Sequence, residues 1–286
     1  MKTSNHLLRR LTASLLAAVL ALSIALPVFA SDDGDTIYIN SVSDLLSLAR
    51  NCAYDQWSVG KTVILQKDLS LEGMLWEPIP SFSGQFKGNG HTISDLTITG
   101  QYSPAGLFGI VEEQGSIESL SVRGVVSVSD SADTTTGGIV GINHGTLINC
   151  QFTGVVTGDS EVGGIVGRNE SEGTIDHGTA RAIVTGKSST GGIAGYNLGA
   201  ITGCTNVGSI NTEYPEASLD TDGFTAKMVD YINNKMAAAD NDATNSVTNV
   251  ATDTGGIAGR SSGMILTSVN TGTIGYEHVG YNVGGI

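Results

Sequence analysis

The five histidines are the side chains best suited to catalysis or metal binding, and they are isolated from one another. A metallopeptidase would carry the motif HExxH on a helix, so that two imidazoles and a glutamate base share one face. None of the histidines begins that motif. The sequence therefore predicts no metallopeptidase centre and no catalytic residue around His6, His91, His144, His177 or His278.

Acidic residues are the next candidates for chemistry, because polysaccharide hydrolases need two carboxyl groups about 5 to 10 Å apart. The acids of the central region fall mostly in expected turns and do not recur as a paired column: Asp130, Asp133, Asp159, Glu161, Glu170 and Glu172. Two triplets are only weakly similar to a hydrolase signature: Asp176-His177-Gly178 and Asn143-His144-Gly145. We do not expect glycosidase or lyase activity in this segment.

The three cysteines, Cys52, Cys150 and Cys204, are too few and too scattered for a disulfide framework. In the repeat register described below, Cys150 and Cys204 would lie about 9.6 Å apart, beyond the roughly 7 Å that a disulfide spans. We predict that they are small buried hydrophobic residues. A Cys-His-Cys metal site with His177 is the alternative.

No cofactor is predicted, but weak calcium binding at acidic turns is left open. The oxygen-rich segments Asp220-Thr-Asp-Gly223 and Asp240-Asn-Asp242 do not continue as an EF-hand or as a calcium-binding nonapeptide. We favour ordinary solvated turn acids.

A recurring glycine tetrad defines the elements that would position these residues. Its five complete copies begin 32, 26, 28 and 64 residues apart, and the long step holds an insertion at about residues 211–254. A sixth copy is cut off at Gly285-Ile286, which predicts that the sequence is a fragment of a longer chain. The tetrad glycines are Gly106, Gly109, Gly138, Gly141, Gly164, Gly167, Gly192, Gly195, Gly256 and Gly259.

Two apolar columns follow the tetrads at matching positions. A small residue stands two positions before each member of the second column. The agreement over five copies indicates a true repeat rather than a glycine-rich composition. The first column is Ile117, Leu147, Ile175, Ile201 and Ile265, and the second, nine residues on, is Val126, Val156, Val184, Ile210 and Ile274.

Units of 26 to 32 residues with three short β-branched strands cannot bury an apolar face alone, but stacked units share one core. The sequence thus predicts an all-β, parallel β-helix or solenoid, with the two columns as inward ladders. Its hand is not specified, although right-handed crossovers are the usual outcome. Glycine is expected at the corners for positive φ and for close backbone approach.

An asparagine follows three of the tetrads at a fixed distance, at Asn143, Asn169 and Asn197. Stacked units would place these asparagines above one another at a corner. They could form a polar row that binds a ligand. We favour a structural ladder, in which side-chain amides bond from one unit to the next.

The tetrads and their spacing resemble the GLUG repeat family of bacterial surface proteins, which includes stalk regions of some immunoglobulin A peptidases. The segments Lys67-Asp-Leu-Ser-Leu71, Trp76-Glu-Pro-Ile-Pro80 and Phe86-Lys-Gly-Asn-Gly-His-Thr-Ile93 resemble the first part of such proteins. The resemblance covers about residues 37–286. It implies an architecture and a surface location, not a chemistry.

Helical patterns occur at two places. Ser43 to Asn51, with Ser41 or Ser43 as N-cap, predicts a helix within an N-terminal cap at 31–60 that covers the open end of the solenoid at 61–286. In the insertion, apolar residues four apart predict a helix with Thr221 or Asp222 as N-cap. We favour a helix lying on the solenoid flank over a partner-binding helix. Its apolar stripe is Phe224, Met228, Ile232 and Met236.

The first thirty residues predict a secretory signal peptide: three basic residues, an apolar run from Leu11 to Leu26 and small residues before Ser31. Its removal leaves 11 basic and 28 acidic residues, a net charge of −17. This charge argues against nucleic acid and anionic membranes as partners. We therefore expect a secreted or cell-surface location.

The predicted function is a non-catalytic scaffold or adhesive module, an adhesin-like part of a larger bacterial protein, whose partners are host or cell-wall glycans or proteins. The alternative is the N-terminal region of a secreted metallopeptidase or polysaccharide-acting enzyme, with its catalytic part downstream. A carbohydrate-binding module would need an exposed aromatic platform. Only Trp57, Trp76 and a few tyrosines could build one.

Overall fold

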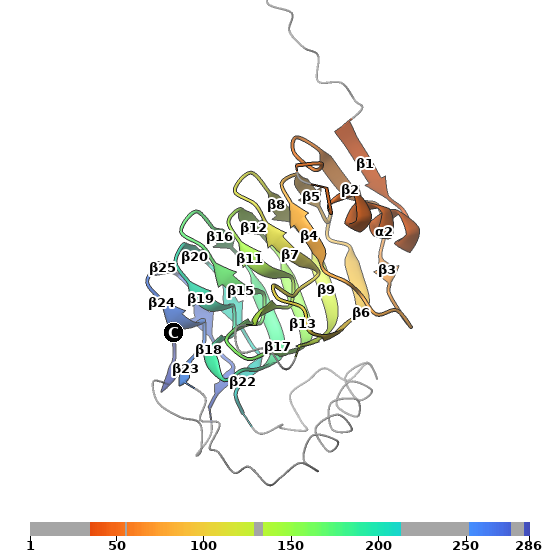
Figure 1. Ribbon diagram of the computed structural model, residues 1–286. Helices are drawn as coiled ribbons and strands as arrows, with labels where there is room; N and C mark the ends of the chain where they lie inside the picture. The colour runs from red at the N-terminus through yellow and green to blue at the C-terminus, as the bar shows by residue number, and fades with distance from the viewer. Residues whose placement is uncertain (1–34, 55, 129–133, 213–251, 276–282) are drawn as a thin grey trace, which may run out of the picture. The chain divides into compact units, whose positions relative to one another are not determined.

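Short runs of β-branched residues between glycines and asparagines form the strands of this chain, as their preference for pleated surfaces dictates. The computed structural model describes residues 35–54, 56–128, 134–212, 252–275 and 283–286. In it, parallel strands coil into a β-solenoid of about seven turns (Figure 1). The predicted fold class is therefore confirmed. The proposed signal peptide and the insertion helix lie outside the described residues.

The chain passes through four parallel sheets in each regular coil, and not through the three strands that we predicted. The additional strand comes from the residues just before each tetrad, such as Thr135–Gly137, which pair with the same residues of the next coil. We name the sheets A to D. Regular coils run through them in the order C, A, B and D. One such coil consists of β11 (Val140–Asn143), β12 (Thr146–Ile148), β13 (Gln151–Thr157) and β14 (Glu161–Gly163).

The strands of each sheet pair in register from coil to coil. Sheet A contains β1 (Thr36–Ile39), β2 (Thr62–Leu65), β5 (Gln85–Lys87), β8 (Ser116–Glu118), β12 (Thr146–Ile148), β16 (Thr174–Asp176), β20 (Ala200–Thr202) and β25 (Met264–Leu266). Sheet B contains β3 (Leu69–Ser70), β6 (Thr92–Gly100), β9 (Ser121–Val128), β13 (Gln151–Thr157), β17 (Thr179–Thr185), β21 (Thr205–Asn206), β22 (Ser209–Ile210), β26 (Val269–Asn270) and β27 (Thr273–Ile274).

Sheets C and D complete each coil. Sheet C contains β4 (Ile79–Phe82), β7 (Phe108–Val111), β11 (Val140–Asn143), β15 (Val166–Asn169), β19 (Ala194–Asn197) and β24 (Ala258–Ser261). Sheet D contains β10 (Thr135–Gly137), β14 (Glu161–Gly163), β18 (Ser188–Gly191), β23 (Thr252–Gly255) and β28 (Val283–Gly284).

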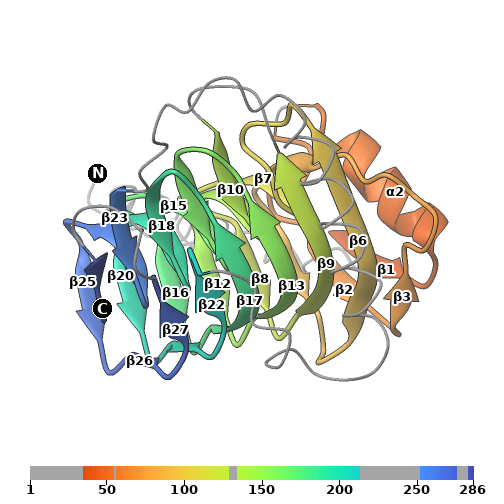
Figure 2. The same cartoon turned by 90° about the horizontal axis from the view of Figure 1, so that it is seen from below.

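The described residues include one helix, α2 (Val42–Asn51), which lies at the end of the stack and contacts β1 and β4 (Figure 2). Ser41 is its N-cap, as predicted, because the Ser41 hydroxyl accepts a hydrogen bond from the Asp44 backbone N–H at 3.2 Å. Leu45 and Leu48 are buried in the core. No helix in the described part of the chain is long and apolar enough to cross a membrane.

The glycine tetrads lie at the corner between sheets D and C. Of the two reasons that we expected for corner glycines, positive φ is wrong for the tetrads and close approach holds. None of the ten tetrad glycines, all of which are described, has a φ in the left-handed region. Instead, from the second copy onward the first glycine of a tetrad leaves room for an inward side chain of sheet B: a Cβ on Gly138 would overlap the Phe152 ring, and one on Gly192 would overlap Asn206. Close approach therefore accounts for these glycines.

Left-handed backbone occurs at another corner, between sheets A and B. The residue two positions after the first apolar column has a positive φ in five successive coils. Asparagine tolerates this conformation and glycine favours it. These residues are Ser119, Asn149, His177, Gly203 and Thr267.

Candidate functional site

The two apolar columns face the interior from sheets A and B. Leu147 pairs with Ile117 and Ile175 in sheet A, and Val156 pairs with Val126 and Val184 in sheet B. All six side chains are fully buried. The sheet A ladder also continues toward the N-terminus through Phe86, Val63 and Ile37.

The three corner asparagines form a hydrogen-bonded ladder inside the solenoid. The Asn143 Nδ2 donates to Asn169 Oδ1 at 2.8 Å, and the Asn169 Nδ2 donates to Asn197 Oδ1 at 2.8 Å. Asn197 Nδ2 then donates to Ser261 Oγ at 3.1 Å. The asparagine side chains are fully buried, so the structural ladder is confirmed and the ligand-binding row is wrong.

Cys150 and Cys204 are buried free thiols in one column of the coil. Burial raises the pKa of the Cys150 thiol to about 12 and that of the Cys204 thiol to about 11. His177 points elsewhere, since its ring is 62% exposed and its Nδ1 lies 2.9 Å from Asp176 Oδ1. The three side chains therefore do not face a common metal position. No group of three ligating side chains occurs within the described ranges.

We expect the three native thiols to resist a thiol-specific reagent at pH 8, because the thiolate is the reactive form and all three have raised pKa values. Counting labelled thiols by mass spectrometry should give none in the native chain and three after denaturation. A Thr157→Cys variant, which places a thiol on a partly exposed outer position, should react under native conditions. Rapid labelling of unmodified native chain would contradict this expectation.

Two of the candidate acids converge on one cation, which the sequence did not predict. The Arg168 guanidinium contacts Glu161 Oε1 at 3.0 Å and Glu170 Oε1 at 2.7 Å. It also lies 5.3 Å from the ring centroid of Tyr196 in the next coil. Burial raises the pKa of Glu161, although Arg168 opposes the shift. A guanidinium held between the two carboxylates gives them a structural partner rather than a shared substrate position.

Each of the remaining candidate acids either makes a local contact or lies outside the described residues. Asp159 Oδ1 accepts from the Lys187 ammonium at 2.6 Å. The Ser171 hydroxyl lowers the pKa of Glu172 by hydrogen bonding. Asp130, Asp133 and the two calcium-type acidic segments at 220–223 and 240–242 lie outside the described residues.

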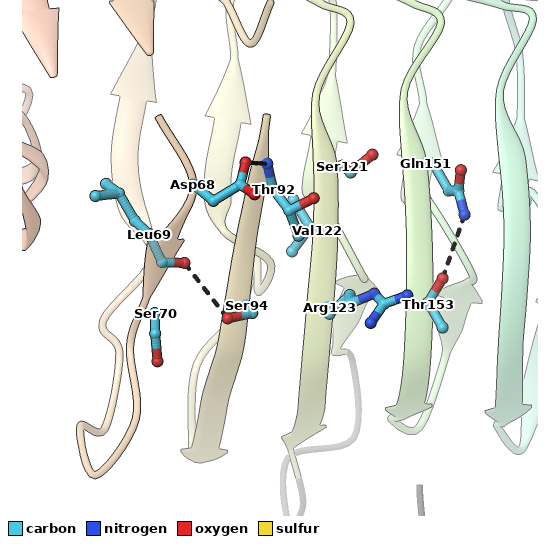
Figure 3. A pocket seen from close by; sticks show the side chains of 10 residues that line it. All are labelled: Asp68, Leu69, Ser70, Thr92, Ser94, Ser121, Val122, Arg123, Gln151 and Thr153. Carbon is cyan, nitrogen blue, oxygen red and sulfur yellow. Dashed lines mark hydrogen bonds between the residues drawn. The ribbon is translucent and has the colours of Figure 1, made fainter. Parts of the chain in front are cut away.

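A shallow polar groove of about 530 Å³ lies on sheet B (Figure 3). It is lined by outward side chains near the first residues of successive strands. Register places Thr92 beside Ser121, and Ser121 beside Gln151. Because alternate residues face outward, Arg123 and Thr153 follow on the same face. The lining residues are Asp68, Leu69, Ser70, Thr92, Ser94, Ser121, Val122, Arg123, Gln151 and Thr153.

Local hydrogen bonds hold the N-terminal wall of the groove. Asp68 Oδ1 accepts from the Thr92 backbone N–H at 2.9 Å and lies 3.1 Å from His91 Nδ1. These partners lower the pKa of the Asp68 carboxyl. Asp95, at an irregularity of β6, accepts from the hydroxyls of Ser70 and Ser94 at 2.6 and 2.8 Å.

The groove offers hydrogen-bonding groups without an activated nucleophile. The hydroxyls of Ser70 and Ser94 donate to the Asp95 carboxylate rather than to a histidine ring. The nearest acid and imidazole, Asp68 and His91, are 74% and 34% exposed. A nucleophile needs a base within hydrogen-bond reach, about 3 Å.

No family model matches this sequence. Over 155 residues the chain is 30% identical to halomucin of Haloquadratum walsbyi, a match covering 50% of this chain and 2% of halomucin. Over 137 residues it is 29% identical to a protein named as a Gly-rich membrane protein of Evansella cellulosilytica, covering 35% of this chain and 16% of that protein. The chain thus spans a small part of the curated relatives it matches.

The fold is similar to a crystal structure described as an immunoglobulin A1 protease from Bacteroides ovatus. The TM-score is 0.59, and the match covers 85% of this chain and 68% of that one. At 18% sequence identity, this likeness shows the fold alone.

An aromatic platform for sugars is not built from the two tryptophans. Trp76 is buried at 2% exposure, and its indole N–H donates to the Leu107 carbonyl at 3.2 Å. Trp57 is half-buried, with the Lys61 ammonium 5.4 Å from its ring centroid. Trp76 thus belongs to the core, where its polar group is satisfied.

The groove could not be recognised from residue types alone, because most of its lining residues are ordinary serines, threonines and a glutamine. A usable signal existed, however. Gln151 and Thr153 stand five and three positions before the second-column residue Val156, so the alternation of a strand places them outward. The same offsets from Val126 find Ser121 and Arg123.

Proposed function

We propose that this chain is a non-catalytic scaffold of a secreted or cell-surface protein, in which stacked coils extend and display other parts. The continuous inward ladder carries this proposal. Eight sheet A strands stack in register, while the cysteines and corner asparagines that could do chemistry are buried and the Glu161–Arg168–Glu170 group is internally paired. Such a core needs repetition, not an active site.

The resemblance to GLUG repeats supports the surface role, because those repeats belong to bacterial surface proteins. The similarity to halomucin and to a protein named as a membrane protein points the same way. We further propose that the polar groove of sheet B contacts host or cell-wall glycans or proteins through hydroxyl, amide and guanidinium groups.

A pair of matched glutamines tests the binding role. Gln151 lines the groove, whereas Gln85 lies exposed on the outside of sheet A. On glycan and peptide arrays, Gln151→Ala should weaken binding about fivefold, the effect of one hydrogen bond, and Gln85→Ala should not. Equal effects of the two substitutions would exclude the groove.

The non-catalytic role is tested by incubating the chain with cell-wall polysaccharides and with peptides, and by measuring new reducing ends and new amino termini. We expect neither to form. Hydrolysis that is lost in an Asp68→Asn variant would overturn the scaffold proposal.

A second candidate is a segment of a secreted peptidase or polysaccharide-acting enzyme. The observation in its favour is the solved structure described as an immunoglobulin A1 protease. This candidate requires a catalytic motif, such as HExxH, elsewhere in a longer chain. Reading the gene beyond Ile286 tests it, and a surface-anchoring segment there instead would favour the scaffold.

A further inference from the structure

A grid of outward polar side chains lies on three successive strands of sheet B. The strands β9, β13 and β17 each contribute two of them, because alternate residues of a strand face the same side. Four of the six side chains line the groove of Figure 3, and the two from β17 continue it by one coil. We call the six residues the polar grid. Register arranges them in a first row of Ser121, Gln151 and Thr179 and a second row of Arg123, Thr153 and Arg181.

The second row concentrates positive charge on an acidic protein. Arg123 and Arg181 are two of only 11 basic residues beyond the first thirty, against 28 acidic ones. Arg181 is exposed, and Arg123 lines the groove. A guanidinium has five N–H donors, so an arginine can bind a ligand carboxylate in addition to a protein group. The nearby acids Asp68 and Asp95 lie in earlier coils and accept hydrogen bonds there, so the grid itself favours an anionic ligand.

The spacing of the two arginines selects the kind of anion. Arg123 and Arg181 are two coil steps apart, about 9.6 Å, with Thr153 between them. In an extended peptide, side chains on one face recur at about 7 Å and about 13 Å, so a row of acidic residues falls out of step with the arginines. An extended polysaccharide presents equivalent groups on one face at every second sugar. Two pyranose rings have nearly the length of two coil steps, so a polysaccharide matches the row.

The first row supplies groups that hydrogen-bond sugar hydroxyls. The hydroxyls of Ser121 and Thr179 can both donate and accept, and so can the amide of Gln151. Gln151 Nε2 also donates to Thr153 Oγ1 at 3.5 Å, which joins the two rows (Figure 3). An amphipathic helix would need an apolar anchor, and the six grid residues offer none. The grid therefore suits a polar, extended chain.

We propose that the polar grid binds an acidic polysaccharide that carries a carboxylate on alternate sugars. The polysaccharide runs across the strands, along the solenoid axis. Arg123 and Arg181 each pair with one carboxylate, and the first row bonds the sugar hydroxyls on the other side of the chain. This inference rests on the proposed function, because it names the ligand class of the same groove.

Calorimetric titration of the protein with a hyaluronate oligosaccharide tests the inference, because hyaluronate carries one carboxylate on every second sugar. The matched probe is the same oligosaccharide with its carboxyl groups reduced to alcohols. Hyaluronate should bind at least about tenfold more tightly than the reduced probe, the effect of one charge-assisted hydrogen bond. Arg181→Gln should weaken hyaluronate binding by a similar factor. Arg50→Gln, at an exposed position of α2, is the matched control and should not.

Equal binding of the two oligosaccharides, or equal effects of the two arginine substitutions, would overturn the inference. So would the absence of hyaluronate binding. Tighter binding of polyglutamate than of hyaluronate would overturn it in favour of an acidic peptide. If Gln151→Ala weakens binding on the arrays while Arg181→Gln leaves hyaluronate binding unchanged, only the ligand class is wrong. If neither substitution has an effect, the binding role of the groove fails as well.

Discussion

Replacing Gly192 with alanine is expected to lower the free energy of unfolding by about 3 kcal/mol. A Cβ at this position would overlap the carbonyl oxygen of Gly256 and the amide group of Asn206. Neither neighbour can move freely, because Ile193 N–H donates to the Ile257 carbonyl at 2.8 Å and Asn206 Nδ2 donates to Asn270 Oδ1 at 2.7 Å. Urea unfolding monitored by circular dichroism measures the change.

Gly285 provides the matched control in the 286-residue chain. It occupies the same tetrad position, and a Cβ there would meet no atom within 4 Å. Gly285→Ala should therefore leave stability unchanged within about 0.5 kcal/mol. If Gly192→Ala were equally harmless, close backbone approach would not explain the tetrads.

Replacing Asn169 with valine is expected to cost about 2 to 6 kcal/mol, because buried polar groups on both sides lose their partners. Asn197 Oδ1 would lose its donor, and one Asn143 N–H would lose its acceptor. The Gly173 carbonyl would also lose the Asn169 amide at 3.1 Å. Valine is a compatible shape, since Val111 occupies this column two coils earlier. Urea unfolding again reports the loss.

Asn143→Val should cost less, about 1 to 3 kcal/mol, because Asn143 is the end of the ladder. Its Oδ1 has no hydrogen-bond partner, so its removal also eliminates one unsatisfied buried acceptor. The two variants have the same change in side chain and differ only in position. Equal costs would show that hydrogen bonding along the ladder does not dominate the effect.

The register of the solenoid could be predicted because inward positions repeat in residue type. Ile175 and Val184 stand in the expected columns, and Ser41 caps the expected helix. The fourth sheet could not be predicted in this way. Its strands, such as Glu161–Gly163, are only two to four residues long, and glycine gives no apolar alternation.

The burial of three outward side chains of sheet B, Val125, Val155 and Ile183, was missed for a different reason. Val125-Val126 and Val155-Val156 are adjacent β-branched pairs, and such a pair sends one side chain to each face of a sheet. The sequence does not distinguish an outward valine that is covered from one that is solvated. The second hydrogen-bonded asparagine pair, Asn206 and Asn270, was missed because alanine and phenylalanine occupy the same column in earlier coils.

The unequal spacing of the coils bears on how the chain folds. Outside the insertion, coil-to-coil partners are about 23 to 32 residues apart, so each new coil closes a short loop onto the previous one. Ile210 and Ile274 pair in the same register across 64 residues. Closing this longer loop costs only about 0.7 kcal/mol more than closing an ordinary one. We therefore expect folding to spread coil by coil from either side and to slow only modestly at the insertion.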